Sequence, residues 1–239
     1  MSERLVRCSS NEAAACETAL RIARHFEARP GALVAPAAGF TPLAAYGKLA
    51  LMAKKGEADP ASMRYIGLDE WIGVGPADAG SCIATMNGAF YGPCGVPPER
   101  IRAFDGLAED PAQEARAMDA YLASAGGLSL AVLGIGLNGH VGFNEPGRPL
   151  PGLFSLTELS ETTVSAGRKY FGGRPVPTHG ATVTLAALMA AEEVLLVATG
   201  AHKREIVRAV LAGADVPAAK FLAHPNAVYI FDAEAYPAE

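Results

Sequence analysis

A cluster of chemically capable side chains lies in residues 133–147, LGIGLNGHVGFNEPG. Asn138, His140, Asn144 and Glu145 follow an apolar run that ends in Gly-x-Gly. Such a run predicts a buried strand that stops at a tight turn, and α/β enzymes keep their ligands at such strand ends. A histidine beside a carboxylate can give and take protons near neutral pH. We expect an acid–base site here, with Glu145 orienting the imidazole and stabilising its charged form; a plain turn is the alternative.

A second pair of carboxylates, Asp69 and Glu70, follows the apolar residues of 64–68 and precedes Trp71. One interpretation is a helix cap or turn pair that faces water. The other is a catalytic base at the carboxyl edge of a sheet. A base that removes a proton from carbon must reach that carbon and be partly shielded from water, and a strand end beside an aromatic residue provides both.

Two segments have the composition of strand-to-helix junctions. In the first, AGFTP at 38–42, we expect Thr41 to cap a helix that begins at Pro42. Backbone N–H groups at such a helix start suit a phosphate, although the same letters also describe an ordinary turn. The second, GAHK at 200–203, places Lys203 where it reaches a bound anion or is simply solvated.

The elements that must position these groups alternate along the chain. Apolar periodicity predicts helices over 11–28, from 42 onward, from Asp110 to the glycines at 126–127, over 185–191 and over 203–212. Ser9 and Glu12 have the spacing of a capping box for the first helix. Short apolar runs predict strands at 32–35, 64–68, 128–133, 194–198 and 227–231. This alternation predicts an α/β fold with a parallel sheet covered on both faces.

Length and composition predict one domain over residues 1–239. Periodicity is weak between 149 and 178, where glycine and proline recur, so we expect a mobile lid there. The N-terminus has no signal-type apolar stretch, and no apolar run reaches the roughly 20 residues of a membrane span, so we expect a cytoplasmic protein without a membrane contact. The net charge of −5 argues against a nucleic-acid partner.

Metal and nucleotide chemistry find little support in the sequence. The five histidines show no ligand spacing such as HExxH, and no GxGxxG or GxxxxGK[ST] motif occurs. The four cysteines form no CxxC pair and are expected to be reduced thiols. We therefore expect neither a metal nor a cofactor.

Taken together, the segments resemble the glucosamine-6-phosphate deaminase (isomerase) family, within the larger group that includes 6-phosphogluconolactonases. GIGLNGHVGFNEPG resembles the signature of the deaminases, and LDEWIGV resembles their LDEY-G segment. GFTP resembles their TGGTP phosphate loop, KYF at 169–171 their RYF, and GAHK their GxxK. The resemblance runs in the same order from near the N-terminus to about Asp232.

This resemblance implies a Rossmann-like three-layer α/β/α sandwich that converts glucosamine 6-phosphate and water into fructose 6-phosphate and ammonia without metal or redox cofactor. It implies that Asp69 moves a proton between C2 and C1, that His140 promotes opening of the sugar ring, and that Glu145 supports His140. Asn138 stands where some members have aspartate and completes the catalytic set. The candidate residues for binding substrate and phosphate are Ala38, Gly39, Phe40, Thr41, Gly139, Lys169 and Lys203.

Several positions depart from the family pattern. Ala38 lacks a threonine hydroxyl, Phe40 replaces a glycine, and Lys169 replaces an arginine. If that glycine serves a positive φ or the close approach of a ligand, Phe40 should hinder it. Galactosamine 6-phosphate and unphosphorylated aminosugars therefore stay open as substrates, and a sugar-phosphate lactonase and a non-catalytic sugar-phosphate-binding protein stay open as alternatives. Because the chain ends soon after its last strand, we expect a monomer or a small homo-oligomer.

Overall fold

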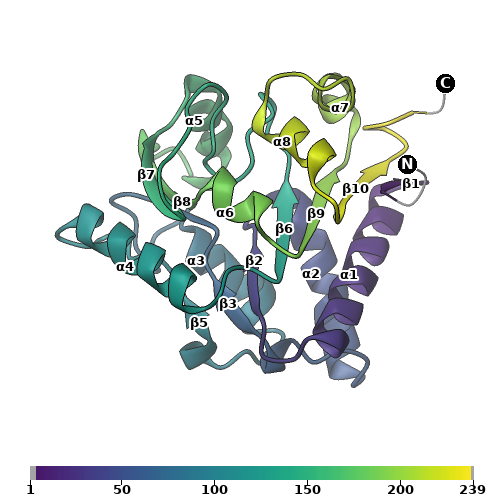
Figure 1. The fold of residues 1–239 in the computed structure, drawn as a ribbon, viewed down its shortest axis with the longest axis horizontal. Coiled ribbons are helices and arrows are strands. Elements are labelled where there is room, and N and C mark those ends of the chain that lie inside the picture. The colour runs from purple at the N-terminus through teal and green to yellow at the C-terminus, as the bar shows by residue number, and fades with distance from the viewer. Residues whose placement is uncertain (1–3, 238–239) are drawn as a thin grey trace.

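A seven-stranded sheet forms the centre of the computed structural model, which describes residues 4–237 (Figure 1). Its strands run in the order β1-β10-β9-β6-β2-β3-β5, and every neighbouring pair is parallel. Their bounds are β1 Leu5–Cys8, β2 Leu33–Pro36, β3 Arg64–Ile66, β5 Ile101–Arg102, β6 Leu130–Gly134, β9 Glu193–Ala198 and β10 Ala227–Asp232. All carboxyl ends therefore meet at one edge.

Helices cover both faces of this sheet because both faces are apolar. On β6, Leu130 and Val132 pack with the core of α1 (Asn11–Ala28) and α2 (Phe40–Lys54), whereas Ala131 and Leu133 pack on the opposite side. The helices on that opposite side are α4 (Pro111–Ser124), α6 (Leu185–Met189), α7 (Arg204–Leu211) and α8 (Pro217–Lys220). The alternation has the strand period of two. The expected three-layer α/β/α fold is confirmed.

A second, smaller sheet stands beside the first. It is antiparallel, in the order β4-β8-β7, with β4 at Asp69–Trp71, β7 at Phe154–Glu158 and β8 at His179–Val183. Figure 1 shows β7 and β8 beside α5 (Glu161–Gly167), away from α1 and α2. The chain between β4 and β5 forms α3 (Cys82–Met86) and a π-helical turn, Asn87–Tyr91.

Most of the predicted elements are confirmed, with corrections at their ends. The first helix spans the predicted residues, but Ser10 rather than Ser9 caps it, accepting from the N–H of Ala13. The second helix begins at Phe40 with Gly39 as its cap, two residues before the predicted start. The predicted strand 64–68 is shorter, and Asp69 opens β4 of the small sheet instead of ending a strand of the large one.

The segment 149–178 contains more regular structure than its sequence indicates. It holds β7, α5 and a 3-10 turn at Arg168–Tyr170. Ser160 caps α5 by accepting from the N–H of Thr163, and Phe154 and Leu159 are buried. That the segment moves as a lid remains a prediction.

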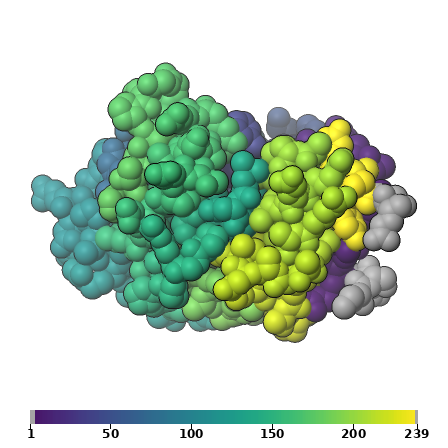
Figure 2. All heavy atoms as spheres, turned by 90° about the horizontal axis from the view of Figure 1, so that it is seen from above, coloured from purple at the N-terminus to yellow at the C-terminus, as the bar shows by residue number. Residues whose placement is uncertain are grey.

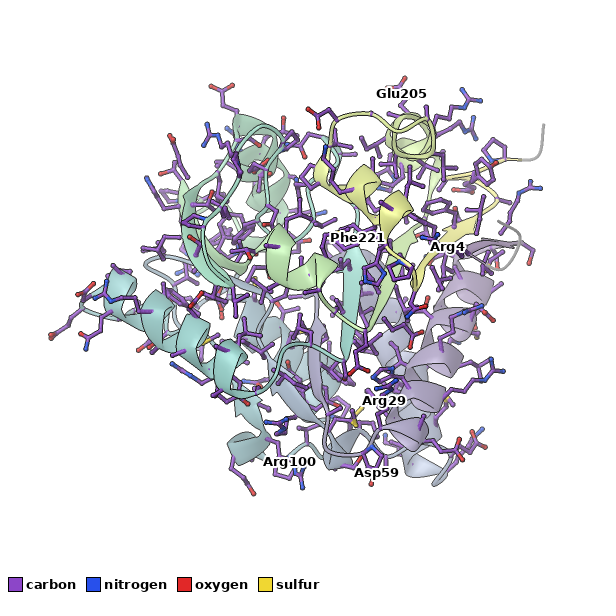
Figure 3. The ribbon with its side chains drawn as sticks, viewed as in Figure 1. Arg4, Arg29, Asp59, Arg100, Glu205 and Phe221 are labelled. Atoms are coloured by element: carbon purple, nitrogen blue, oxygen red, sulfur yellow. The ribbon has the colours of Figure 1, made fainter. Side chains whose placement is uncertain are left out.

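Side-chain bonds tie distant parts of the chain together at the edge of the sheet. The guanidinium of Arg4 donates to the carbonyl oxygens of Phe221, Leu222, His224 and Ala227, and Figure 3 shows Arg4 near Phe221. These bonds fix the start of β1 against the turn that leads into β10. Within residues 4–237, no helix combines the length and the apolar character that crossing a bilayer requires.

Candidate active site

A pocket of about 670 Å³ opens at the carboxyl ends of the parallel strands. This volume lies within the range typical of small-molecule sites. Figure 2 views this end of the molecule, with the green residues around 150–180 on one side and the yellow-green residues around 200–220 on the other. Asp69 and His140 both line the pocket, together with Lys169 and Lys203. The structure thus brings the two predicted catalytic segments into one cavity.

His140 sits on a turn that immediately follows β6. The N–H of Gly136 donates to the carbonyl of His140 (2.9 Å), and the N–H of Gly139 donates to the carbonyl of Gly136 (3.0 Å). A Cβ at position 136 would stand 2.2–2.4 Å from the atoms of the imidazole ring. Gly136 is therefore required because the ring packs directly on its backbone.

Glu145 reaches His140 through Asn138 rather than directly. The amide nitrogen of Asn138 donates to Glu145 Oε2 (2.8 Å), and the N–H of Ser160 donates to Glu145 Oε1 (3.1 Å). On its other side, Asn138 Oδ1 lies 2.6 Å from His140 Nδ1. Thr163 Oγ1 lies 3.1 Å from the same ring nitrogen.

These contacts determine which nitrogen of His140 is basic. A carboxylate only accepts hydrogen bonds, so the NH₂ of Asn138 must face Glu145 and its oxygen must face the ring. Nδ1 then carries the proton and donates it to Oδ1, which leaves Nε2 as the basic nitrogen.

The pKa values agree with a neutral imidazole. Burial lowers the pKa of His140 to about 4; Glu145 raises it and Lys203 lowers it further. Although burial alone would raise the pKa of Glu145, hydrogen bonds from Thr163, Asn138 and the N–H of Ser160 lower it. The expectation that Glu145 stabilises the charged imidazole agrees with its raising of this pKa, but burial outweighs the effect of Glu145 and leaves the ring neutral.

Asp69 reaches the pocket from the small sheet. Its strand partner on β8 is Thr182, whose hydroxyl donates to the carbonyl of Leu68 (3.3 Å) and accepts from the N–H of Phe143 (3.2 Å). Thr182 therefore connects the strand of Asp69 to the loop of His140. A Cβ at Gly142 would come within 2.8 Å of the Thr182 hydroxyl, so this glycine, with φ +54°, lets the loop of His140 lie against β8.

The two neighbouring carboxylates have different surroundings. Glu70 is 2% exposed and accepts from the N–H groups of Trp71, Cys82 and Ile83 and from the hydroxyl of Ser81. It anchors the start of α3, so the cap interpretation is correct for Glu70, although it is buried rather than solvated. Asp69 faces the pocket, where burial and the neighbouring Glu70 raise its pKa to about 7, against a smaller lowering by Cys82.

The other side of the pocket is cationic. Ala38, Gly39, Phe40 and Thr41 line it at the start of α2, where no side chain caps the helix. Lys203 Nζ donates to the carbonyl of Ile135 (2.6 Å), and burial together with the charge of Lys169 lowers the pKa of Lys203 to about 8. The N–H groups of a helix start beside two ammonium groups form an arrangement that suits a phosphate.

Phe40 does not strain this loop. Within residues 4–237 every positive φ belongs to a glycine, so the backbone at Phe40 is of an ordinary kind. Phe40 therefore does not meet the hindrance that a positive φ would impose, while its effect on the close approach of a ligand remains a prediction.

Not every candidate residue lines the pocket. Asn138 and Glu145 lie behind His140, and Gly139, with φ +83°, turns toward Val216. Three residues of the site were not predicted: Ser160, which lies beside Glu145, and the pocket residues Tyr170 and Cys82. The capping pattern of Ser160 before α5 was a usable signal for the first of these. Among the described residues, no group of three or more His, Cys, Asp and Glu side chains is placed to hold a metal ion.

Comparison with known proteins places these residues in a family. Residues 9–230 match the family described as glucosamine-6-phosphate isomerases/6-phosphogluconolactonase. The glucosamine-6-phosphate deaminase of Lysinibacillus sphaericus is 32% identical over 212 residues, which cover 87% of this chain and 90% of that protein. The glucosamine-6-phosphate deaminase of Cutibacterium acnes is 34% identical over 229 residues, 94% of this chain and 88% of that protein.

Solved structures show the same architecture. A monomeric glucosamine-6-phosphate deaminase superposes with a TM-score of 0.92 at 28% identity, covering 97% of this chain and 98% of that one. A 6-phosphogluconolactonase from Thermotoga maritima superposes with a TM-score of 0.76 at 20% identity, covering 95% and 99%. The second likeness concerns the fold alone.

Replacing Asn138 by aspartate should raise the pKa of His140 by about 1 to 2, because a charged acceptor at Nδ1 favours the imidazolium. NMR titration of the imidazole protons measures this, with Asn87→Asp, an exposed change outside the pocket, as the control of equal charge. An unchanged His140 titration in the Asn138→Asp variant would contradict the proposed contact.

Proposed function

This chain belongs to the glucosamine-6-phosphate isomerase/6-phosphogluconolactonase family, and on that basis we propose that it is an isomerising deaminase of an aminosugar phosphate. The proposed reaction converts glucosamine 6-phosphate and water into fructose 6-phosphate and ammonia. The observation that carries the proposal is the shared pocket, in which a carboxylate with a raised pKa and a neutral imidazole stand beside two lysines.

The phosphate is proposed to bind at the cationic side of the pocket. The N–H groups at the start of α2, the hydroxyl of Thr41 and the ammonium groups of Lys169 and Lys203 are the groups that would hold it. These contacts are remote from the carbons that react. They fix the sugar relative to the catalytic groups and so lower the entropic part of the barrier.

His140 is proposed to open the sugar ring. A closed aminosugar has no carbonyl group and therefore no acidic C2 proton. With Nδ1 engaged by Asn138, Nε2 can take the proton of the C1 hydroxyl and deliver it to the ring oxygen as the C1–O bond breaks. Asn138 and Glu145 keep the imidazole in the tautomer that this step requires.

Asp69 is proposed to act on the open chain. Its carboxylate removes the proton from C2, which the C1 aldehyde acidifies, and returns it to C1. The aldehyde oxygen gains a proton and becomes the C1 hydroxyl, the nitrogen loses one, and the C2–N bond becomes an imine. Water then hydrolyses the imine to the ketone and ammonia. A carboxylate with an ordinary pKa is a weak base, whereas the raised pKa of Asp69 matches its proton affinity to neutral pH.

The identity of the sugar and the state of assembly are further parts of the proposal. We propose glucosamine 6-phosphate rather than galactosamine 6-phosphate as the substrate. The two relatives described above are glucosamine-6-phosphate deaminases, and this chain aligns with most of the length of each. The deaminase structure described as monomeric superposes over nearly the whole length of both chains, which supports a monomer here.

An ammonia-release assay tests the reaction class. The wild-type protein should release ammonia from glucosamine 6-phosphate, and Asp69→Asn should lower kcat at least about 100-fold while leaving substrate binding within a few-fold. Calorimetry with the variant measures the binding. Acid release from 6-phosphogluconolactone without any ammonia would instead identify a lactonase, and tight binding without turnover of any aminosugar phosphate would identify a binding protein.

Replacing His140 by glutamine should affect ring opening most. We expect about a 10- to 100-fold lower kcat on the cyclic substrate, because glutamine cannot take up the proton. The reverse reaction starts from fructose 6-phosphate and ammonia and exchanges the C1 proton with solvent before the aminosugar ring closes. The rate of this exchange should therefore fall less than the forward kcat. Equal losses in both measurements would remove the ring-opening role.

The pKa values predict a narrow bell-shaped pH profile of kcat/KM. Activity should rise as Asp69 ionises near pH 7 and fall as Lys203 loses its proton near pH 8, while His140 stays neutral throughout. Initial rates between pH 5 and 10 measure the profile. In Lys203→Arg the alkaline limb of the profile should shift to higher pH, because arginine keeps its charge. An alkaline limb at the same pH would exclude Lys203 as its origin.

A further inference from the structure

Phe40 is an apolar side chain in an unusual place. It is the first residue of α2, it lines the pocket on the cationic side, and 58% of its surface is exposed. Leu51, on the same helix, is comparably exposed at 54% but does not line the pocket. Single exposed apolar residues are common on protein surfaces. The contacts of Phe40 distinguish it from such a residue.

Those contacts are with the two residues that face α2 from the segment after α5. The ring of Phe40 stacks on the ring of Tyr170, with centroids 5.1 Å apart and planes 19° from parallel. Lys169 Nζ lies 4.6 Å from the centroid of Phe40 and 5.0 Å from that of Tyr170. Both distances are within the range of a cation–π interaction.

The ammonium of Lys169 is thus held by neutral groups. No ion pair of the residues that the structure describes includes Lys169. A carboxylate partner would fix the lysine equally well, but it would cancel the positive charge and repel an incoming anion. An aromatic face attracts the cation through its quadrupole and leaves the net charge of the site positive.

We propose that Phe40 is a positioning residue of the anion site: its ring holds the Lys169 ammonium at the pocket so that the charge stays available to the phosphate of a sugar phosphate. A lysine is a flexible point charge, and the ring supplies the restraint on its direction that the side chain itself lacks. The identity of the ligand rests on the proposed function, whereas the contact between Phe40 and Lys169 does not.

Two substitutions of Phe40 distinguish the effect of its π face from the effect of its apolar bulk. Phe40→Leu should raise KM for glucosamine 6-phosphate about 3- to 10-fold with kcat nearly unchanged, whereas Phe40→Tyr, which keeps the π face, should stay within about twofold of the wild type. Leu51→Ala is the matched control for loss of an exposed apolar group on α2 and should change neither constant. An unchanged or lowered KM in Phe40→Leu would overturn the proposal, as would a loss confined to kcat.

A double-mutant cycle tests whether Phe40 acts through Lys169. Once Lys169 is replaced by methionine, the further change Phe40→Leu should have no additional effect on KM. An equal effect of Phe40→Leu in both backgrounds would show that the ring acts independently of the lysine and would overturn the proposal.

Binding of inorganic phosphate makes the test independent of turnover. Calorimetry measures it on the four proteins of the cycle: the wild type, Phe40→Leu, Lys169→Met and the double variant. If the wild type released no ammonia from any aminosugar phosphate, the proposed function would fail, while a weaker phosphate affinity in Phe40→Leu alone would still support the role of Phe40. Equal phosphate affinity in the wild type and in Phe40→Leu would overturn that role, whatever the enzyme assay shows.

Discussion

The carboxylate of Glu145 is the fixed point from which the catalytic side of the pocket is ordered. It is 3% exposed and can only accept hydrogen bonds, so two of its donors, the amide of Asn138 and the N–H of Ser160, must point their hydrogens at it. The first donor sets the tautomer of His140, and the second fixes the start of α5. One buried acceptor therefore aligns the turn after β6 with the segment that covers it.

The number of hydrogen-bond donors around each carboxylate also explains the difference between Asp69 and Glu70. Successive side chains of a strand point to opposite faces, so the two carboxylates must enter different surroundings. Glu70 accepts from three donors at the start of α3 and from the N–H of Trp71, and so holds the chain in place, whereas Asp69 enters a pocket with few donors and keeps a high proton affinity. A structural carboxylate and the proposed base thus come from adjacent residues because the backbone between them is extended.

The sequence predicts those parts of the molecule that depend on local periodicity. The helix over 11–28, the strand before Gly134 and the glycine turn around His140 follow from apolar spacing and turn chemistry, and each is present. The strand that carries Asp69 could not be predicted correctly, because the sequence RYIGLDEW has no break that separates two strands. In the structure the chain leaves the large sheet at Gly67, which lies close to Ala103. The indirect contact of Glu145 with His140 was equally out of reach. It runs through Asn138, and the other oxygen of Glu145 is held by the N–H of Ser160, fifteen residues further on.

The two lysines on the anion side of the pocket have no carboxylate partner among the described residues. They differ in this from cations such as Arg29 and Arg102, which pair with carboxylates that offset their charge. Lys203 is instead held by the carbonyl of Ile135, and Lys169 by two aromatic rings. Neutral partners fix the direction of an ammonium group without cancelling its charge, at the cost of a lower pKa where the group is buried, as for Lys203. The positive charge of both lysines therefore stays available at the pocket, which is what the proposed phosphate site requires.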